Sequence, residues 1–257
     1  MQFFRKSLAQ SKRKSYLCKH HSSVIIHPSS FIRHHSHQFR MHPIHLTLTT
    51  PTGKLGLCAS RFWGNPALPG QEAYPMYVDA DGETYPYVFI CQINLEELAP
   101  YDPLHRLPQR GLLSFFAKID AYLGCCGGAI PLLGGFISDT SEVKVLYFPD
   151  TDHMSEVVLL DEEDDSPISP FELQVGFGQP REPFADDHAL FAPPAYRPWE
   201  TWDAPYEDWE ILLQVDSFEG ADFTLNFMDC GVLDFLISPD DLRHHRFDRV
   251  RAIVLST

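Results

Sequence analysis

The sequence predicts an α+β fold that is mainly β, internally duplicated, with two pseudo-symmetric halves packed into one domain and few short helices. Three observations lead to this prediction. Short apolar runs bounded by turn residues recur along the chain, helix signals are few, and one pair of strand patterns occurs twice in the same order. A chain of 257 residues is long enough to bury a substantial core.

The strand patterns begin just after Met41. They are short, rich in β-branched and aromatic residues, and bounded by Gly, Pro, Asp or Asn. We expect strands at residues 44–49, 86–93, 111–117, 143–148, 156–160, 171–177, 210–216, 223–227, 231–237 and 249–255.

Two helix signals stand out among these strands. Asn94 precedes "LEELAP" as a possible N-cap, which predicts one or two helical turns. Ser238 precedes "PDDLRHHRF", and Pro239 then occupies the favoured first helical position.

The duplication is visible in two strand pairs. "FICQIN", ending at Asn94, resembles "ILLQVD", ending at Asp216, and "GLLSFF" from Gly111 resembles "GVLDFL" from Gly231. This similarity predicts halves at about 41–150 and 151–257. Each half would leave one apolar face uncovered, so residues 41–257 should form a single domain.

Charge divides the chain into two parts. Residues 1–40 contain eight Lys or Arg and no Asp or Glu, so residues 41–257 hold 12 basic and 35 acidic residues, a net charge of −23. The acidic residues 41–257 should repel nucleic acid and anionic membranes. A basic protein is the partner that this charge favours, although acidity also serves solubility.

Residues 1–40 are basic and rich in Ser and His, as in organellar transit peptides, and they lack the apolar core of a secretory signal. The competing interpretation is an over-extended start or a disordered extension, since a strand pattern begins just after Met41. The apolar stretch 125–137 is too short and too interrupted by Gly and Pro to cross a bilayer. The six cysteines form no C-x-x-C pair, which favours buried thiols and a cytoplasmic location.

No motif indicates a particular catalysis. The chain has no G-x-S-x-G, no H-E-x-x-H and no complete phosphate loop, so we expect no cofactor, no metal and no enzyme signature.

Four polar residues in the repeated strands are the first candidate binding residues: Gln92, Asn94, Gln214 and Asp216. They could converge near a pseudo-twofold axis and line a pocket. The alternative is architectural: the glutamines satisfy backbone groups, while Asn94 and Asp216 cap the following turns. Amides are poor proton carriers, which favours the architectural interpretation.

Three further candidates lie outside those strands. Trp199 and Trp202 belong to an aromatic and proline-rich segment, 177–209, which is either a recognition loop or a long connection pinned to the core. Asp229 is a carboxylate that a site between the halves could use.

Several stretches together resemble the YwqG-like family, a bacterial family of unknown function. They are "SRFWGNPALP" from Ser60, "FICQINLEEL", "LPQRGLLSFF", "VLYFPD", "ILLQVDS", "GVLDFLISPDDL" and "FDRVRAIVL", which ends at Leu255. The resemblance implies an α+β fold with a largely β core and implies no activity. The chain departs from the family at Met228–Gly231, where members have a Gly-Asp-x-Gly turn.

From these observations we expect a non-enzymatic, soluble domain that engages a basic protein, with an immunity or antitoxin-like role as a concrete form. The alternative is a small-molecule-binding protein or enzyme whose site lies at the interface between the two halves.

Overall fold

The computed structural model describes residues 42–119, 136–161, 163–178, 187–194, 202–220, 222, 224–227 and 230–255. Residues 43–257 form one compact unit, and the fold below is the fold of that unit.

A large antiparallel sheet dominates the described part of the chain. Several neighbours in the sheet are far apart in sequence: β1 pairs with β10 and β11, which both come more than 120 residues later. In spatial order the ten strands are β16 (Arg251–Leu255), β15 (Val232–Ile237), β12 (Glu210–Asp216), β11 (Ala189–Leu190), β1 (Ile44–Thr49), β10 (Leu173–Gly178), β2 (Arg61–Phe62), β6 (Val88–Asn94), β7 (Leu112–Ala117) and β8 (Val143–Phe148).

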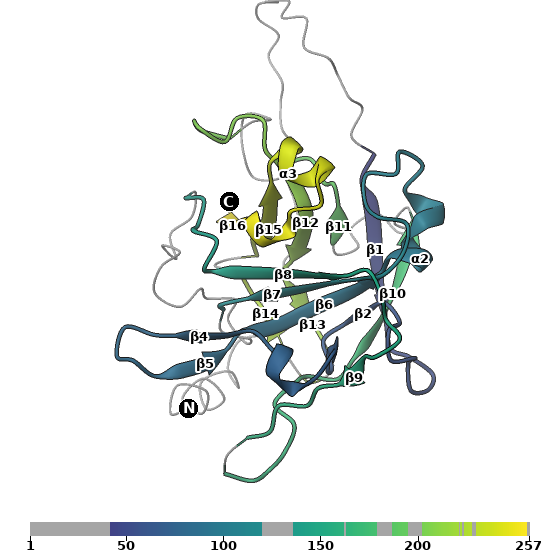
Figure 1. Cartoon of the computed structure of the whole chain (residues 1–257), viewed down its shortest axis with the longest axis vertical. Coiled ribbons are helices and arrows are strands. Elements are labelled where there is room, and N and C mark those ends of the chain that lie inside the picture. The colour runs from purple at the N-terminus through teal and green to yellow at the C-terminus, as the bar shows by residue number, and fades with distance from the viewer. Residues whose placement is uncertain are drawn as a thin grey trace, which may run out of the picture. The chain divides into compact units, whose positions relative to one another are not determined.

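The sheet curls until it is nearly closed, and its two ends meet across the core. The rings of Phe115 on β7 and Phe235 on β15 contact edge to face, with centroids 5.3 Å apart. Figure 1 shows β6, β7 and β8 crossing in front of β12 and β15. Curling in this way lets one face of all ten strands bury a common apolar cluster.

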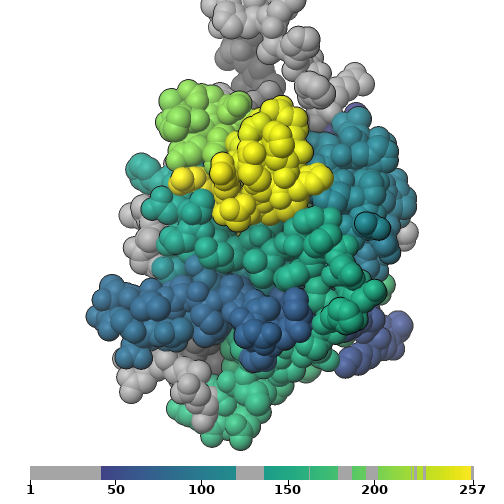
Figure 2. All heavy atoms as spheres, in the orientation of Figure 1, coloured from purple at the N-terminus to yellow at the C-terminus, as the bar shows by residue number. Residues whose placement is uncertain are grey.

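The C-terminal residues pack against the open edge at β8. The ring of Phe247, in the 3₁₀ helix η3 (Phe247–Arg249), lies 5.8 Å from the ring of Tyr147 on β8. Figure 2 shows the C-terminal segment against the band of residues that contains β8. This contact covers apolar surface that an open sheet edge would expose.

Three two-stranded sheets lie outside the large one in the described ranges. Figure 1 shows the β4–β5 hairpin projecting from the molecule. The pairs are β3 (Ala67–Leu68) with β9 (Ser155–Glu156), β4 (Met76–Val78) with β5 (Thr84–Pro86), and β13 (Phe218–Glu219) with β14 (Thr224–Leu225).

The described helices are short, and both α-helices begin where their caps predict. Asn94 Oδ1 accepts a hydrogen bond from the Glu96 N–H at the start of α2 (Leu95–Leu98). Ser238 Oγ accepts one from the Asp241 N–H at the start of α3 (Pro239–Arg243). The remaining helical turns are the 3₁₀ helices η1 (Gln71–Ala73) and η2 (Ala99–Tyr101).

The mainly β prediction is confirmed, and the longer predicted strands are found within a few residues of their expected bounds. The strand expected at 156–160 is reduced to the two residues of β9. Six strands of two or three residues were not predicted from the sequence: β2, β3, β4, β5, β11 and β13. Such short strands contain too few residues to show an alternating pattern.

Candidate functional site

Gln92 is buried on β6, and it hydrogen-bonds entirely to backbone groups. Its Nε2 donates to Leu57 O at 3.0 Å and to Ala59 O at 2.9 Å. Its Oε1 accepts the Ala67 N–H at 2.9 Å. The amide therefore fixes Leu57 and Ala59, in the segment that leads from β1 into β2, and ties Ala67 of β3 to the same strand.

Asn94 binds the same segment between β1 and β2. Its Nδ2 donates to Cys58 O at 3.1 Å, and its own N–H donates to Ser60 Oγ at 2.9 Å. Since its Oδ1 caps α2 as well, every polar atom of this side chain serves the backbone. Both functions agree with the architectural interpretation of the two amides.

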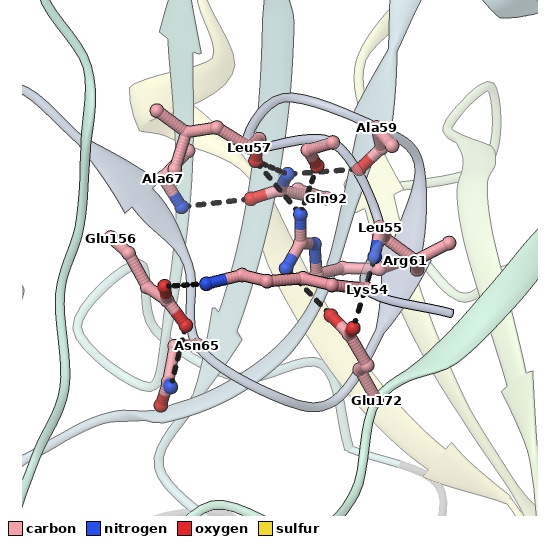
Figure 3. Close-up of polar contacts among 11 residues, drawn as sticks. Lys54, Leu55, Leu57, Ala59, Arg61, Asn65, Ala67, Gln92, Glu156 and Glu172 are labelled. Atoms are coloured by element: carbon pink, nitrogen blue, oxygen red, sulfur yellow. Dashed lines mark hydrogen bonds and ion pairs between the residues drawn. The ribbon is translucent and has the colours of Figure 1, made fainter. Parts of the chain in front are cut away.

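Arg61, which the sequence analysis did not single out, is the charged centre of this group. Its guanidinium is almost fully buried and donates from Nη1 to Glu172 Oε2 at 2.7 Å. Nη2 donates to Leu57 O at 2.9 Å and also to Gly56 O. Figure 3 shows Gln92 and Arg61 hydrogen-bonded to the same loop, at Leu57. The β2 strand is only two residues long, which hid this buried position from pattern analysis.

A second ion pair lies at the rim of this loop. Lys54 Nζ contacts Glu156 Oε2 at 2.9 Å, and Asn65 Nδ2 donates to Glu156 Oε1 at 3.1 Å. The hydrogen bonds from Lys54 and Asn65 lower the pKa of Glu156. Because Lys54 is exposed, this pair adds little stability and mainly anchors the loop end.

Gln214 and Asp216, on β12, bind a different backbone segment. Gln214 Nε2 donates to Asp187 O at 2.8 Å, and Asp216 Oδ2 accepts the Asp187 N–H at 3.0 Å. The Asp216 N–H donates to His188 Nδ1 at 3.0 Å. Burial lowers the pKa of His188 to about 4, so its imidazole is neutral at neutral pH, with the proton on Nε2.

Asp234 on β15 is the most unusual polar residue of the described chain. It is 0% exposed, and neither of its carboxylate oxygens has a hydrogen-bond partner among the described residues. It lies directly opposite Gln214 in the β12–β15 register. Desolvation first, and then the charges of Asp187 and Asp216, raise the pKa of its carboxyl well above the usual range.

The polar candidates thus fall into two groups. Gln92 and Asn94 attach residues 57–60, whereas Gln214 and Asp216 attach residues 187–188. In the sheet order, β11, β1, β10 and β2 lie between β12 and β6. Each group therefore serves its own loop, and the contacts favour an architectural role for the four side chains.

Trp202 lies in the core. It is 2% exposed, packs with Ile211 and Leu236 in a second apolar cluster, and donates from Nε1 to Trp209 O at 3.0 Å. This position favours a packing role for the part of segment 177–209 that contains it. Trp199 and Asp229 lie outside the described residues.

The described cysteines are of two kinds. Cys91 is a buried free thiol, as expected, and burial raises its pKa, which makes it unreactive at neutral pH. Cys58 is a half-buried free thiol. Cys230, however, is disulfide-bonded, which corrects the expectation that the cysteines are free thiols.

In the part of the chain that the structure describes, no three His, Cys, Asp or Glu side chains are placed to hold a metal ion together. The described helices include none with the length and apolar character needed to cross a bilayer.

Comparison with known proteins gives a family and no activity. No curated protein matches the chain. The model of one family, described as a domain of unknown function (DUF1963), matches residues 60–254, a range that includes both groups of polar residues. Because the match covers most of the sequence, the chain belongs to the DUF1963 family.

Proposed function

We propose that this protein is a non-enzymatic binding domain that engages a basic protein partner. The observation that supports the proposal most is the net charge of −23 on residues 41–257, which contain 35 acidic and only 12 basic residues. A surface of this charge steers cationic partners toward it and repels polyanions.

The β4–β5 hairpin is the contact surface that we propose for this partner. Asp81 and Glu83 are exposed at its turn, while Met76 and Val78 on β4 are 48% and 62% exposed. Asp79 Oδ1 accepts the N–H groups of Asp81 and Glu83, which holds the turn rigid. Exposed apolar side chains beside carboxylates suit a partner that presents Lys or Arg around an apolar patch.

We also propose that the domain arose by internal duplication. The sheet order supports this, since β2, β6, β7 and β8 on one side are matched by β11, β12, β15 and β16 on the other. The β6–β7 ladder has a bulge after Phe89, and the β12–β15 ladder has one after Ile211. Trp63 and Phe191, just after β2 and β11, both have a φ of 57°.

Equivalent hydrogen bonds give the same correspondence. The Trp63 N–H donates to Ile90 O, and the Phe191 N–H donates to Leu212 O. Bulges, left-handed residues and hydrogen bonds therefore recur in the same order in both parts, which chance similarity of strands does not require.

Within its family we propose that the chain is YwqG-like, because the residues that resemble that family coincide with the matched range 60–254. An immunity or antitoxin-like role in the cytoplasm would suit an acidic domain, because inhibitors of basic toxins commonly use a complementary charged surface.

The experiment is affinity capture with the full chain at low and at high salt, followed by binding measurements on the captured protein. A supporting result is a basic partner whose Kd rises steeply with salt. The double variant Asp81→Lys/Glu83→Lys should weaken that Kd at least about tenfold, because it places cations against cations.

The matched control is Asp150→Lys/Asp152→Lys, which reverses two exposed charges that are not part of the hairpin. Equal weakening by both double variants would remove the hairpin as the contact surface. Absence of any salt-sensitive partner would overturn the proposal as a whole.

A further inference from the structure

The outer face of β12 and β15 contains polar atoms that the described structure leaves unsatisfied. Asp234 Oδ1 and Oδ2 have no partner among the described residues, and neither has Gln214 Oε1. All three are acceptors as ordinarily drawn, yet Gln214 and Asp234 are directly opposite in the antiparallel ladder. Side chains in such a pair start from Cβ atoms only about 5 Å apart.

The hydrogen bond from Nε2 fixes the orientation of the Gln214 amide. Nε2 donates to Asp187 O at 2.8 Å, so Oε1 is the atom left for a neighbour. A donor is needed beside it, because a buried amide oxygen without one costs free energy. An ionised Asp234 cannot supply that donor, but a protonated carboxyl can.

The surroundings of Asp234 also oppose a charge. Along the strand it lies between Val232 and Leu236, and on its other side it faces Ile253 of β16. These three residues belong to the same apolar cluster as Trp202. Removing a carboxylate from water into such a cluster is strongly unfavourable unless a cation accompanies it.

Among the described residues, the charged groups on the elements around Asp234 provide no free cation. Asp216 on β12 and Asp187 before β11 are negative, and Asp187 contacts His45 at 3.0 Å. On β16, Arg251 donates to Ser138 O at 2.8 Å and contacts Asp139 at 3.3 Å. The remaining charged residues on these elements are Glu210, which pairs with Arg106, and the exposed Asp203, Glu207 and Asp208.

We propose that Asp234 is retained as a neutral carboxylic acid which donates its O–H to Gln214 Oε1, forming a proton-dependent lock between β12 and β15. The proton satisfies the orphaned amide oxygen and removes the charge from the apolar cluster at the same time. Desolvation and the adjacent Asp187 and Asp216 raise the pKa of this carboxyl, which agrees with the lock. Loss of the proton would place two acceptors face to face.

The lock makes stability fall as pH rises. Above the unfolded-state pKa of Asp, about 3.9, the unfolded chain has released this proton while the folded chain still holds it. Folding therefore takes up one proton, and the unfolding equilibrium constant should rise about tenfold per pH unit from this group. The rise ends only where the folded carboxyl itself titrates.

The test compares the full-length protein with Asp234→Asn in urea unfolding from acidic to mildly alkaline pH. Asn keeps the shape, and its Nδ2–H can donate to Gln214 Oε1 without titrating. The ratio of the two unfolding constants should change about tenfold per pH unit, with the Asn variant gaining relative stability as pH rises. Ser114→Ala, which alters the residue opposite Gln92, should show no such pH-dependent difference.

A second readout keeps the test independent of whether Asp234→Asn folds well. Infrared difference spectra of the folded wild-type protein and Asp234→Ser should show a protonated carboxyl C=O band that persists at neutral pH and is lost in the variant. A carboxylate band assigned to Asp234 at neutral pH would overturn the proposal. Parallel stability profiles of the wild-type protein and Asp234→Asn would overturn it equally.

Discussion

At the scale of single residues, the polar side chains of β6 and β12 act on the backbone. Gln92 uses both ends of its amide on three backbone groups, and Asn94 both caps α2 and fixes Cys58. An amide in a buried strand therefore pairs backbone groups of segments that are distant in sequence, since buried backbone groups must be paired. Sequence could predict the amides' role but could not locate the loops, because those lie 25 to 36 residues away.

Replacing Gln92 tests this role directly. Gln92→Leu should lower the free energy of unfolding by about 3 kcal/mol, because Ala67 N, Leu57 O and Ala59 O would all lose a partner. The control is Gln71→Leu at an exposed position, which should change stability by less than about 0.5 kcal/mol. Urea unfolding of both variants measures the effect, and equal stabilities would contradict the assigned role.

The two charged residues that matter most were not anticipated at this scale. Arg61 lies in a strand of two residues, too short for a burial pattern, and its partner Glu172 is distant in sequence. Asp234 did stand visibly within the apolar run "VLDFLI", and that placement is the signal that could have identified it. That its carboxylate has no hydrogen-bond partner among the described residues could be recognised only in the three-dimensional structure.

At the scale of elements, long strands and capped helices follow from local sequence, whereas short strands do not. The strands β1, β8 and β12 have the expected bounds because six or seven residues show both composition and turn signals. The hairpin β4–β5 was missed although "DADG" supplies a turn signal, because each strand holds only three residues.

Gly111 lies immediately before β7, close to the end of β8. Gly111 has a φ of +98°, and a Cβ there would lie 2.3 Å from Phe148 O at the end of β8. Gly82 has a φ of +88° but has no atom within 4 Å of its Cβ position. Gly111→Ala should therefore cost at least about 3 kcal/mol, and Gly82→Ala only about 1 kcal/mol.

Thermal unfolding of the two alanine variants separates backbone strain from collision. Similar losses in both would mean that the carbonyl of Phe148 moves away easily and that only the left-handed backbone matters. A much larger loss for Gly111→Ala would confirm that β7 and β8 approach too closely for a side chain.

At the scale of the whole molecule, the large sheet is completed only by both parts of the chain. β1 takes its two partners, β10 and β11, from beyond residue 150, and β2 takes β10 as one of its own. The sequence predicted an integrated domain from the uncovered faces of two halves. It could not predict that strands from one part lie between strands of the other, since pairing across such distances leaves no local signal.

The acidic surface and the sheet architecture are separate properties at this scale. Charge reversal on the hairpin changes binding in our proposal, whereas it should leave the free energy of unfolding within about 0.5 kcal/mol, because Asp81 and Glu83 are exposed. The proposed function and the fold can thus be tested independently with the same protein.

The most direct test of the central claim, that the two parts complete one sheet, is fragment complementation. Residues 43–150 and 151–257 should each be unfolded by circular dichroism and NMR when produced alone, since β1 and β10 then each lose both of their sheet partners. Produced together, they should associate one to one and recover the dispersed spectrum of the full chain. Either fragment folding stably alone would contradict the claim.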